Sequence, residues 1–218
     1  MSVSVPIELE IRGEIPYRTI PAFTKRLLAA GFRHHSSTRR TSVMSFGATH
    51  GGGSGWKSAR EPEEVDIRCR ITNGKAEVVA KIGVTDAHNR IEIGQPVTLK
   101  ELINFARMFG HMGFFTKVGS KVTENYQRKR TIVSIVHSPS KITYVEIEKM
   151  STREQEAADL QELTILAKDL GLTPFPSRKA FLELCERLTK QDDWEFRGSD
   201  ADIKRLQADI KKARSDKK

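Results

Sequence analysis

Hydrophobic and charged positions alternate strictly near the start of the chain. In residues 7–12, aliphatic side chains take turns with Glu8, Glu10 and Arg12. Side chains two positions apart in a β-strand point to the same face of the sheet. The pattern therefore predicts a strand with one aliphatic face and one charged face. On the charged face, Glu8 and Glu10 lie close enough to share a cation.

The same alternation predicts more strands later in the chain. Residues 38–46 are strand-like, and two alternating segments, 65–71 and 76–82, flank Asn73-Gly74, a dipeptide favoured at the centre of a tight hairpin. Three further strands follow, around residues 89–93, 126–132 and 141–149. The charged faces of these strands carry Asp66, Arg68, Arg70, Glu77, Lys81, Arg90, Glu92, Arg128, Arg130, Glu146 and Glu148.

Apolar residues at helical spacing predict helices between and after the strands. They begin near Thr19, Thr98, Ser151, Ser177 and Asp200. The second and third of these starts have the sequence of a capping box, in which a hydroxyl residue precedes a glutamate by three positions. In the last helix, residues 201–218 carry seven Lys or Arg against three Asp. This composition predicts a solvated basic helix, with contact to nucleic acid as the alternative.

The aliphatic strand faces need cover, and the amphipathic helices can supply it. About eight antiparallel strands that close into a barrel would then place the charged faces inside. We therefore predict an α+β protein, an antiparallel eight-stranded β-barrel that forms a tunnel with a polar interior, flanking helices and C-terminal helices. One domain is expected over residues 1–190, and a basic helical tail over residues 191–218.

Charge and composition narrow the class of partner. The 218 residues include 37 Lys or Arg and 28 Asp or Glu, which gives a formal net charge of +9 and favours anionic partners such as nucleotides, polyphosphates or nucleic acid. Two cysteines, no recognisable targeting segment and no apolar run of bilayer length predict a cytoplasmic protein without a membrane partner. The oligomeric state is not indicated.

A glycine-rich segment, residues 49–58, is predicted to be a flexible hairpin loop because its composition cannot bury anything. Trp56 precedes Lys57 and Ser58, where a nucleotide-binding P-loop needs glycine. The segment is therefore not expected to bind phosphate in that way.

Taken in order, the charged strands resemble the CYTH superfamily of triphosphate tunnel metalloenzymes, which includes class IV adenylyl cyclases and thiamine triphosphatases. The resemblance rests on ELEIR at Glu8, DIRCRITNGKAEVVAKIG from Asp66, RIEI at Arg90, RKR at Arg128 and YVEIEK at Tyr144. It spans about residues 5–190. Three features depart from the family pattern: Arg12 replaces a lysine, Gly94 replaces an acid, and the acid expected before the last strand is missing around SIVHSPSK, residues 134–141.

The resemblance implies Mg²⁺ or Mn²⁺ as cofactor and a small-molecule triphosphate or nucleotide as partner. The implied metal ligands are Glu8, Glu10, Glu146, Glu148 and Glu92. The implied phosphate ligands are Arg68, Arg70, Lys81, Arg90, Arg128 and Arg130. Catalysis would depend on Glu8, Glu10, Arg12 and Lys81.

The function expected from this resemblance is hydrolysis of inorganic, nucleoside or other organic triphosphates with a divalent metal. One alternative is a class IV adenylyl cyclase-like enzyme that converts ATP to cyclic AMP. Another is a phosphate- or RNA-binding module without turnover.

Overall fold

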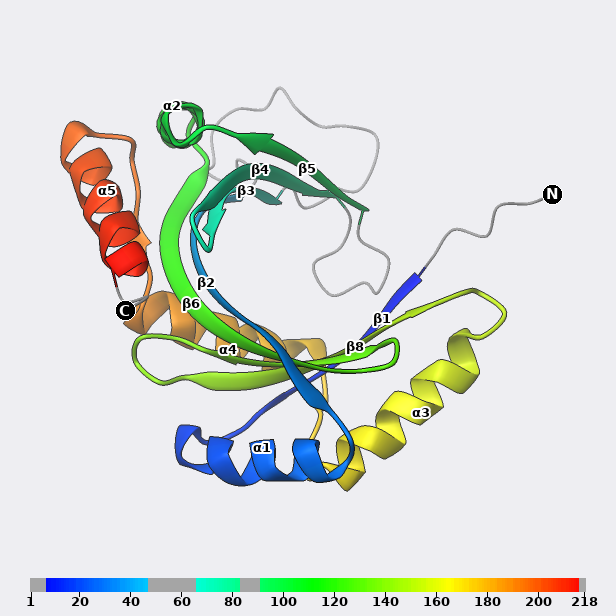
Figure 1. The fold of residues 1–218 in the computed structure, drawn as a ribbon. Helices are drawn as coiled ribbons and strands as arrows, with labels where there is room; N and C mark the ends of the chain where they lie inside the picture. The colour runs from blue at the N-terminus through cyan, green and yellow to red at the C-terminus, as the bar shows by residue number, and fades with distance from the viewer. Residues whose placement is uncertain (1–6, 47–65, 83–90, 216–218) are drawn as a thin grey trace. The chain divides into compact units, whose positions relative to one another are not determined.

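The computed structural model describes residues 7–46, 66–82 and 91–215 (Figure 1). Segment 49–58 and Arg90 lie outside the described residues. The strands are β1 (Ile7–Glu14), β2 (Arg33–Phe46), β3 (Asp66–Thr72), β4 (Lys75–Ile82), β5 (Ile91–Val97), β6 (Phe115–Arg128), β7 (Thr131–His137), β8 (Thr143–Ser151) and β9 (Trp194–Glu195). The helices are α1 (Ile20–Ala29), α2 (Leu99–His111), α3 (Glu156–Asp169), α4 (Arg178–Gln191) and α5 (Asp200–Ser215), with a 3₁₀ turn at Tyr17–Thr19.

The strands form one sheet in the order β1-β8-β7-β6-β2-β3-β4-β5, and β9 pairs with β6. The pairs β1–β8, β8–β7, β7–β6, β2–β3, β3–β4 and β4–β5 are all antiparallel. This confirms the predicted α+β class and the antiparallel sheet of eight principal strands. Within the described residues, β1 and β5 are the two ends of the hydrogen-bonded order.

The chain divides into two compact units. The first comprises residues 1–38 and 121–191, and the second comprises residues 39–120 and 192–218. The long strands β2 and β6 each continue from one unit into the other. Of residues 191–218, which were predicted to be a basic helical tail, residues 192–218 belong to the second compact unit.

In the first unit, helices cover the aliphatic faces of β1 and β8, as the alternation predicts (Figure 1). Leu9 of β1 and Ile147 of β8 pack with Phe23 of α1 and Leu163 of α3, and all four side chains are buried. An ionic cluster adds to this contact, because the Lys149 Nζ atom lies 2.7 Å from Asp159 and 2.5 Å from Glu162 of α3. The charged faces of β1 and β8 are therefore directed away from these helices.

Truncation of Leu163 to alanine should destabilise the first unit strongly. Leu163 is fully buried at the contact between α3 and β1, so the substitution removes apolar contacts and leaves a cavity. We expect a loss of about 3 kcal/mol in the free energy of unfolding, measured by urea denaturation. The matched variant Leu160→Ala, on the exposed side of the same helix, should cost less than about 1 kcal/mol. Equal effects would contradict this packing.

The start of α3 differs from the prediction. Ser151 was expected to begin a helix, but it is the last residue of β8, where it pairs with Ile7. Its hydroxyl donates to the Asp159 carboxylate at 2.7 Å instead of capping a helix. The helix starts at Glu156, after Gln155, which makes no side-chain cap. The pairing of Ser151 with Ile7 and its hydrogen bond to Asp159 therefore prevail over the capping-box sequence at Ser151 and Glu154.

In the second unit, α2 and α5 share an apolar core with β2, β3 and β6. The capping box at Thr98 and Glu101 is confirmed, and the tight turn at Asn73-Gly74 joins β3 to β4. Burial raises the pKa of Cys69 to about 12, so its thiol packs in the core as a neutral group. Helix α5 contributes Ile203, Leu206 and Ile210 to this core.

The buried stripe of α5 corrects the expectation of a solvated terminal helix. Its apolar residues recur at spacings of three and four and therefore lie on one face, which packs into the core of the second unit.

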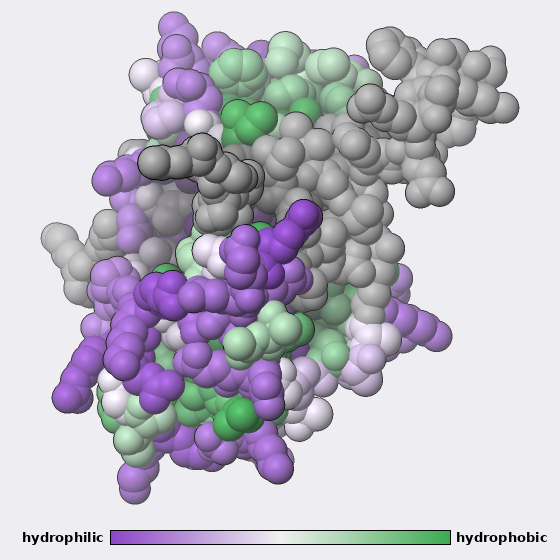
Figure 2. Space-filling model, turned by 90° about the vertical axis from the view of Figure 1, so that its right-hand side faces the viewer, coloured by the Kyte–Doolittle hydropathy of each residue, from purple (hydrophilic) through white to green (hydrophobic). Residues whose placement is uncertain are grey.

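On the face shown in Figure 2, hydrophilic side chains dominate among the described residues, with hydrophobic areas between them. None of the helices in the described part of the chain combines the length and the apolar character needed to cross a bilayer.

Candidate active site

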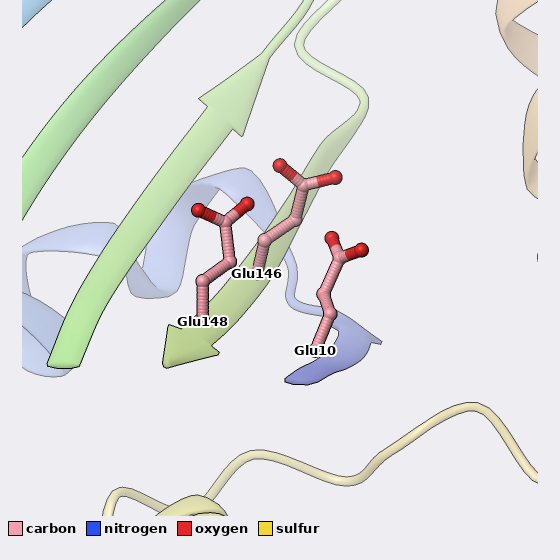
Figure 3. A group of neighbouring side chains, drawn as sticks. All are labelled: Glu10, Glu146 and Glu148. Atoms are coloured by element: carbon pink, nitrogen blue, oxygen red, sulfur yellow. The ribbon is translucent and has the colours of Figure 1, made fainter. Parts of the chain in front are cut away.

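Three carboxylates converge on the charged face of the first unit. Glu10 lies opposite Glu148 in the pairing of β1 with β8, and Glu146 lies two residues before Glu148 on β8. One oxygen of each residue can be chosen so that all three lie within 4.8 Å of one another. Figure 3 shows the side chains leaving the two strands in the same direction. The alternating pattern of both strands thus produces a potential cation site.

Arg12 ties two of these carboxylates together. Its Nη2 atom donates to the Glu10 Oε2 atom, and its Nε atom donates to the Glu146 Oε1 atom at 3.2 Å. Although burial lowers the pKa of Arg12, Glu10 and Glu146 outweigh this and raise it further above its ordinary value. The guanidinium therefore stays charged and holds the two carboxylates side by side.

Glu10 is the most perturbed carboxylate of the group. Its side chain is only 15% exposed. Burial, then repulsion from Glu146 and, more weakly, Glu148, raises the pKa of Glu10 to about 9, although Arg12 opposes the shift. In the absence of a cation, Glu10 is thus protonated at neutral pH. A bound divalent cation would supply the positive charge that the ionised form lacks.

The three residues fit a hard divalent cation. Carboxylate oxygens are the ligands that Mg²⁺ and Mn²⁺ prefer. In addition, the Glu10 Oε1 atom is buried and has no hydrogen-bond partner in the described part of the chain. A buried polar atom without a partner is costly, and a cation would satisfy it.

Helix α4 packs against the same side of the first unit as the carboxylates. The Phe181 ring lies under the Arg12 guanidinium, 4.8 Å from ring centre to Cζ, and Arg187 forms an ion pair with Glu14. Leu184 packs with Tyr144, which lies two residues before Glu146 on β8. The helix therefore covers Arg12 and Tyr144 at one end of the carboxylate group.

Sequence reasoning missed Lys121, which lies on this face of the first unit. The Lys121 Nζ atom donates to the Tyr144 hydroxyl at 3.1 Å and lies 5.1 Å from the centre of its ring. Burial and the nearby Glu146 raise the pKa of Tyr144 well above its ordinary value, so the phenol is a neutral partner. Tyr144 lies two residues before Glu146 and so on the same face of β8, but nothing in the alternation of the sequence connected Lys121 with it.

A neutral polar group also lies beside Glu146. In the register, Ser134 lies opposite both Glu146 and Asn125. The Ser134 hydroxyl donates to Asn125 at 2.8 Å, and the Asn125 amide donates to Ser36 at 2.9 Å. These uncharged side chains could not be recognised in the sequence because they are common in any strand.

In the second unit, β3 and β4 place the predicted basic residues on one face. Arg68 and Arg70 alternate on β3, and Lys81 of β4 lies opposite Asp66. Each arginine is held by an acid: Arg68 by Asp66, at 2.9 and 2.7 Å, and Arg70 by Glu77, at 2.8 Å. We call these residues of β3 and β4 the β3–β4 face.

Some predicted site residues are placed elsewhere. Arg128 donates to the Ala30 carbonyl at 2.8 Å and covers the Phe32 ring, on the face that α1 and α3 cover. Arg130 is exposed in the turn between β6 and β7. Hydrogen bonds from Lys149 and Ser151 lower the pKa of Asp159, and the charge of Arg130 adds to them only weakly. Arg128 lies on the same face of β6 as Tyr126, which is buried in the core of the first unit, whereas Arg130 lies beyond the end of β6. This placement does not agree with the phosphate-binding role expected for the two arginines.

Glu8 is not part of the carboxylate group. It is exposed and lies opposite Met150 in the register, two residues before Glu10 on β1. Glu92 lies opposite Lys81 in the register of β4 and β5 in the second unit, and its side chain is outside the described part of the structure. Among the described side chains, the structure brings together the predicted metal ligands Glu10, Glu146 and Glu148.

No protein-family model matches the chain, and no curated protein sequence matches it. Several solved structures have a similar fold. The PH1012 protein from Pyrococcus horikoshii OT3 has a TM-score of 0.58 and 16% identity, over 81% of this chain and 99% of that one. The PH1819 protein from the same organism has a TM-score of 0.58 and 17% identity, over 83% and 98%.

A protein from Vibrio parahaemolyticus described as a "putative adenylate cyclase" is also similar, with a TM-score of 0.58 and 14% identity, over 81% of this chain and 98% of that one. At these identities the likeness concerns the fold alone. The chain shares the fold of these proteins.

Proposed function

We propose that the protein is a divalent-metal-dependent hydrolase of triphosphate compounds. The observation that carries the proposal is the group formed by Glu10, Glu146 and Glu148, whose oxygens lie within 4.8 Å of one another. Like-charged groups at such distances repel unless a proton or a cation separates them. The buried Glu10 oxygen that lacks a partner supports the cation.

The carboxylates would hold Mg²⁺ or Mn²⁺. When bound, such a cation neutralises phosphate charge and activates water for attack on phosphorus. Arg12 keeps Glu10 and Glu146 in position, and α4 covers Arg12. Both effects favour catalysis by positioning and electrostatics, which is the main requirement of phosphoryl transfer.

In the first unit, the phosphate ligand proposed is Lys121. In the second unit, taken by itself, Arg68, Arg70 and Lys81 are proposed to bind phosphate. Guanidinium groups match the geometry of phosphate oxygens, and ammonium groups act as compact point charges. The formal net charge of +9 adds a general attraction for polyanions.

The test is a phosphate-release screen over tripolyphosphate, ATP and thiamine triphosphate with Mg²⁺ and Mn²⁺. Release that stops when the metal is chelated supports the proposal. If none of the three compounds is hydrolysed under any condition, the proposed function is wrong. Thermal stabilisation by tripolyphosphate without hydrolysis would instead indicate a phosphate-binding module that lacks turnover, and Arg12 in place of lysine would be the first position to examine.

A second candidate is conversion of ATP to cyclic AMP. It is favoured by the shared fold with the Vibrio parahaemolyticus protein described as a "putative adenylate cyclase". Measurement of cyclic AMP and pyrophosphate from the same ATP reactions separates the two candidates. A hydrolase acting on tripolyphosphate releases phosphate and forms no cyclic nucleotide from ATP.

A further inference from the structure

We infer that Arg12 is a built-in cation of the carboxylate group, which therefore binds a single divalent ion. Phe181 of α4 is the positioning residue that keeps the Arg12 guanidinium in this place. The inference rests on the proposed function, in which Glu10, Glu146 and Glu148 bind the metal. It adds the number of ions that the group holds and a role for a helix that lies outside the sheet.

The Arg12 guanidinium already binds two of the three carboxylates. Its Nη2 atom donates to the Glu10 Oε2 atom, and its Nε atom donates to the Glu146 Oε1 atom at 3.2 Å. The side chains of Glu10 and Glu146 are only 15% and 21% exposed. The other Glu10 oxygen, Oε1, is buried and has no hydrogen-bond partner among the described residues. One oxygen of Glu10 thus contacts the guanidinium, and the other remains for a metal ion.

The charges of the group match one divalent ion. Arginine stays protonated in proteins, so the three ionised carboxylates together with Arg12 carry a net charge of minus two. One divalent cation neutralises this charge. A second cation would meet net positive charge in a partly buried place, and it would have to displace the guanidinium from Glu10 or Glu146. Lys121, on the same face, adds to this repulsion.

Helix α4 and the segment before it also hold Arg12. The centre of the Phe181 ring lies 4.8 Å from the Arg12 Cζ atom, and a cation–π contact favours the charged guanidinium at this position. The backbone is held too, because the Phe175 N–H group donates to the Arg12 carbonyl at 2.9 Å. At the next residue, Gly13, an added Cβ atom would collide with the Thr173 carbonyl oxygen. Contacts from outside the carboxylate group therefore keep Arg12 within it.

The first experiment counts the Mn²⁺ ions bound to the full chain, by calorimetry and by the loss of the free Mn²⁺ signal in electron paramagnetic resonance. At a Mn²⁺ concentration that saturates the wild type, Glu10→Gln should bind one ion fewer. Arg12→Gln removes the built-in cation and should bind one ion more than the wild type. The matched control is Arg187→Gln, which removes an arginine paired with Glu14 of the same strand, outside the carboxylate group. It should bind the wild-type number of ions.

The second experiment tests Phe181. Phe181→Leu keeps an apolar side chain but removes the ring, so a metal ion gains easier access to the oxygens that the guanidinium binds. We expect Mn²⁺ to bind about threefold tighter, while kcat for tripolyphosphate falls because Arg12 no longer holds Glu10 and Glu146 firmly. A purely structural role of Phe181 predicts weaker Mn²⁺ binding together with the lower kcat. Phe181→Tyr keeps the ring and should behave as the wild type.

Several outcomes overturn the inference. A loss of two ions in Glu10→Gln, or an unchanged number in Arg12→Gln, refutes the single-ion site. Weaker or unchanged Mn²⁺ binding in Phe181→Leu refutes the positioning role, and this result decides the matter if Arg12→Gln does not fold. If the wild type binds one ion at the carboxylate group but hydrolyses no triphosphate, the inference stands and the proposed function is wrong. If Glu10→Gln loses no ion, the proposed metal site and the inference fail together.

Discussion

Replacement of Glu10 or Glu148 by glutamine should abolish metal-dependent turnover. Each substitution keeps the size of the side chain but removes one of three anionic ligands from the carboxylate group. We expect kcat to fall about 100-fold or more, because the amide is a poor ligand for a hard cation and the remaining pair cannot replace it. The measurement is the initial rate of phosphate release from tripolyphosphate over a titration of Mg²⁺.

The fold should survive both substitutions. Glutamine resembles the protonated carboxyl group that Glu10 carries at neutral pH without a cation, and it relieves repulsion within the group. The matched control is Glu186→Gln, an exposed residue of α4 in the same unit, which should retain wild-type rates. Normal turnover in Glu10→Gln and Glu148→Gln would rule out the carboxylate group as the metal site.

The carboxylate group could be predicted from sequence because its signal has a strict period of two. Around the glutamates, Ile7, Leu9 and Ile11 of β1 and Val145 and Ile147 of β8 occupy every second position, so Glu10, Glu146 and Glu148 point to the other face. The covering helices were recognisable from a different period, the helical spacing of their apolar residues. Long-range pairing added only the register that brings Glu10 opposite Glu148.

The faces of β6 could not be assigned in this way. Polar residues occur on both of its faces, so the basic sequence at Arg128 and Arg130 suggested a charged face that the structure assigns to the helices. Lys121 and Asn125, which do lie on the charged side, follow no distinctive pattern. When the aliphatic residues of a strand are not confined to one face, the sequence alone does not show which face is charged.

Ion pairs and helix contacts depend on tertiary structure and were missed for that reason. That Asp66 pairs with Arg68, its neighbour on one strand, was open to inference, but Glu77 reaches Arg70 only through the hairpin register. The contact of α4 with Arg12 joins residues about 170 positions apart. Likewise, α5 was predicted to be solvated because of its basic composition, and the burial of its apolar stripe depends on packing in the second unit.

The metal-free protein should become less stable as the pH rises, because of Glu10. The folded state holds the pKa of this carboxyl at about 9, against 4.5 for its ordinary value. Between these values the folded protein keeps a proton that the unfolded chain has lost, so the unfolded state binds fewer protons. The contribution of this group is therefore fully present below pH 4.5 and is lost as the pH rises through 9, by up to about 1.4 kcal/mol per pH unit.

Urea denaturation from pH 6 to pH 9, with the metal chelated, measures this dependence in wild-type protein and in Glu10→Gln. The variant cannot titrate at this position, so the difference between the two stabilities should change steadily with pH in favour of the variant. Identical pH slopes would show that Glu10 titrates normally. Added Mg²⁺ should stabilise the wild type more at pH 9 than at pH 6, because the cation competes with the proton for the same carboxylate. An equal effect at both pH values would separate cation binding from Glu10 and would contradict its assignment as a metal ligand.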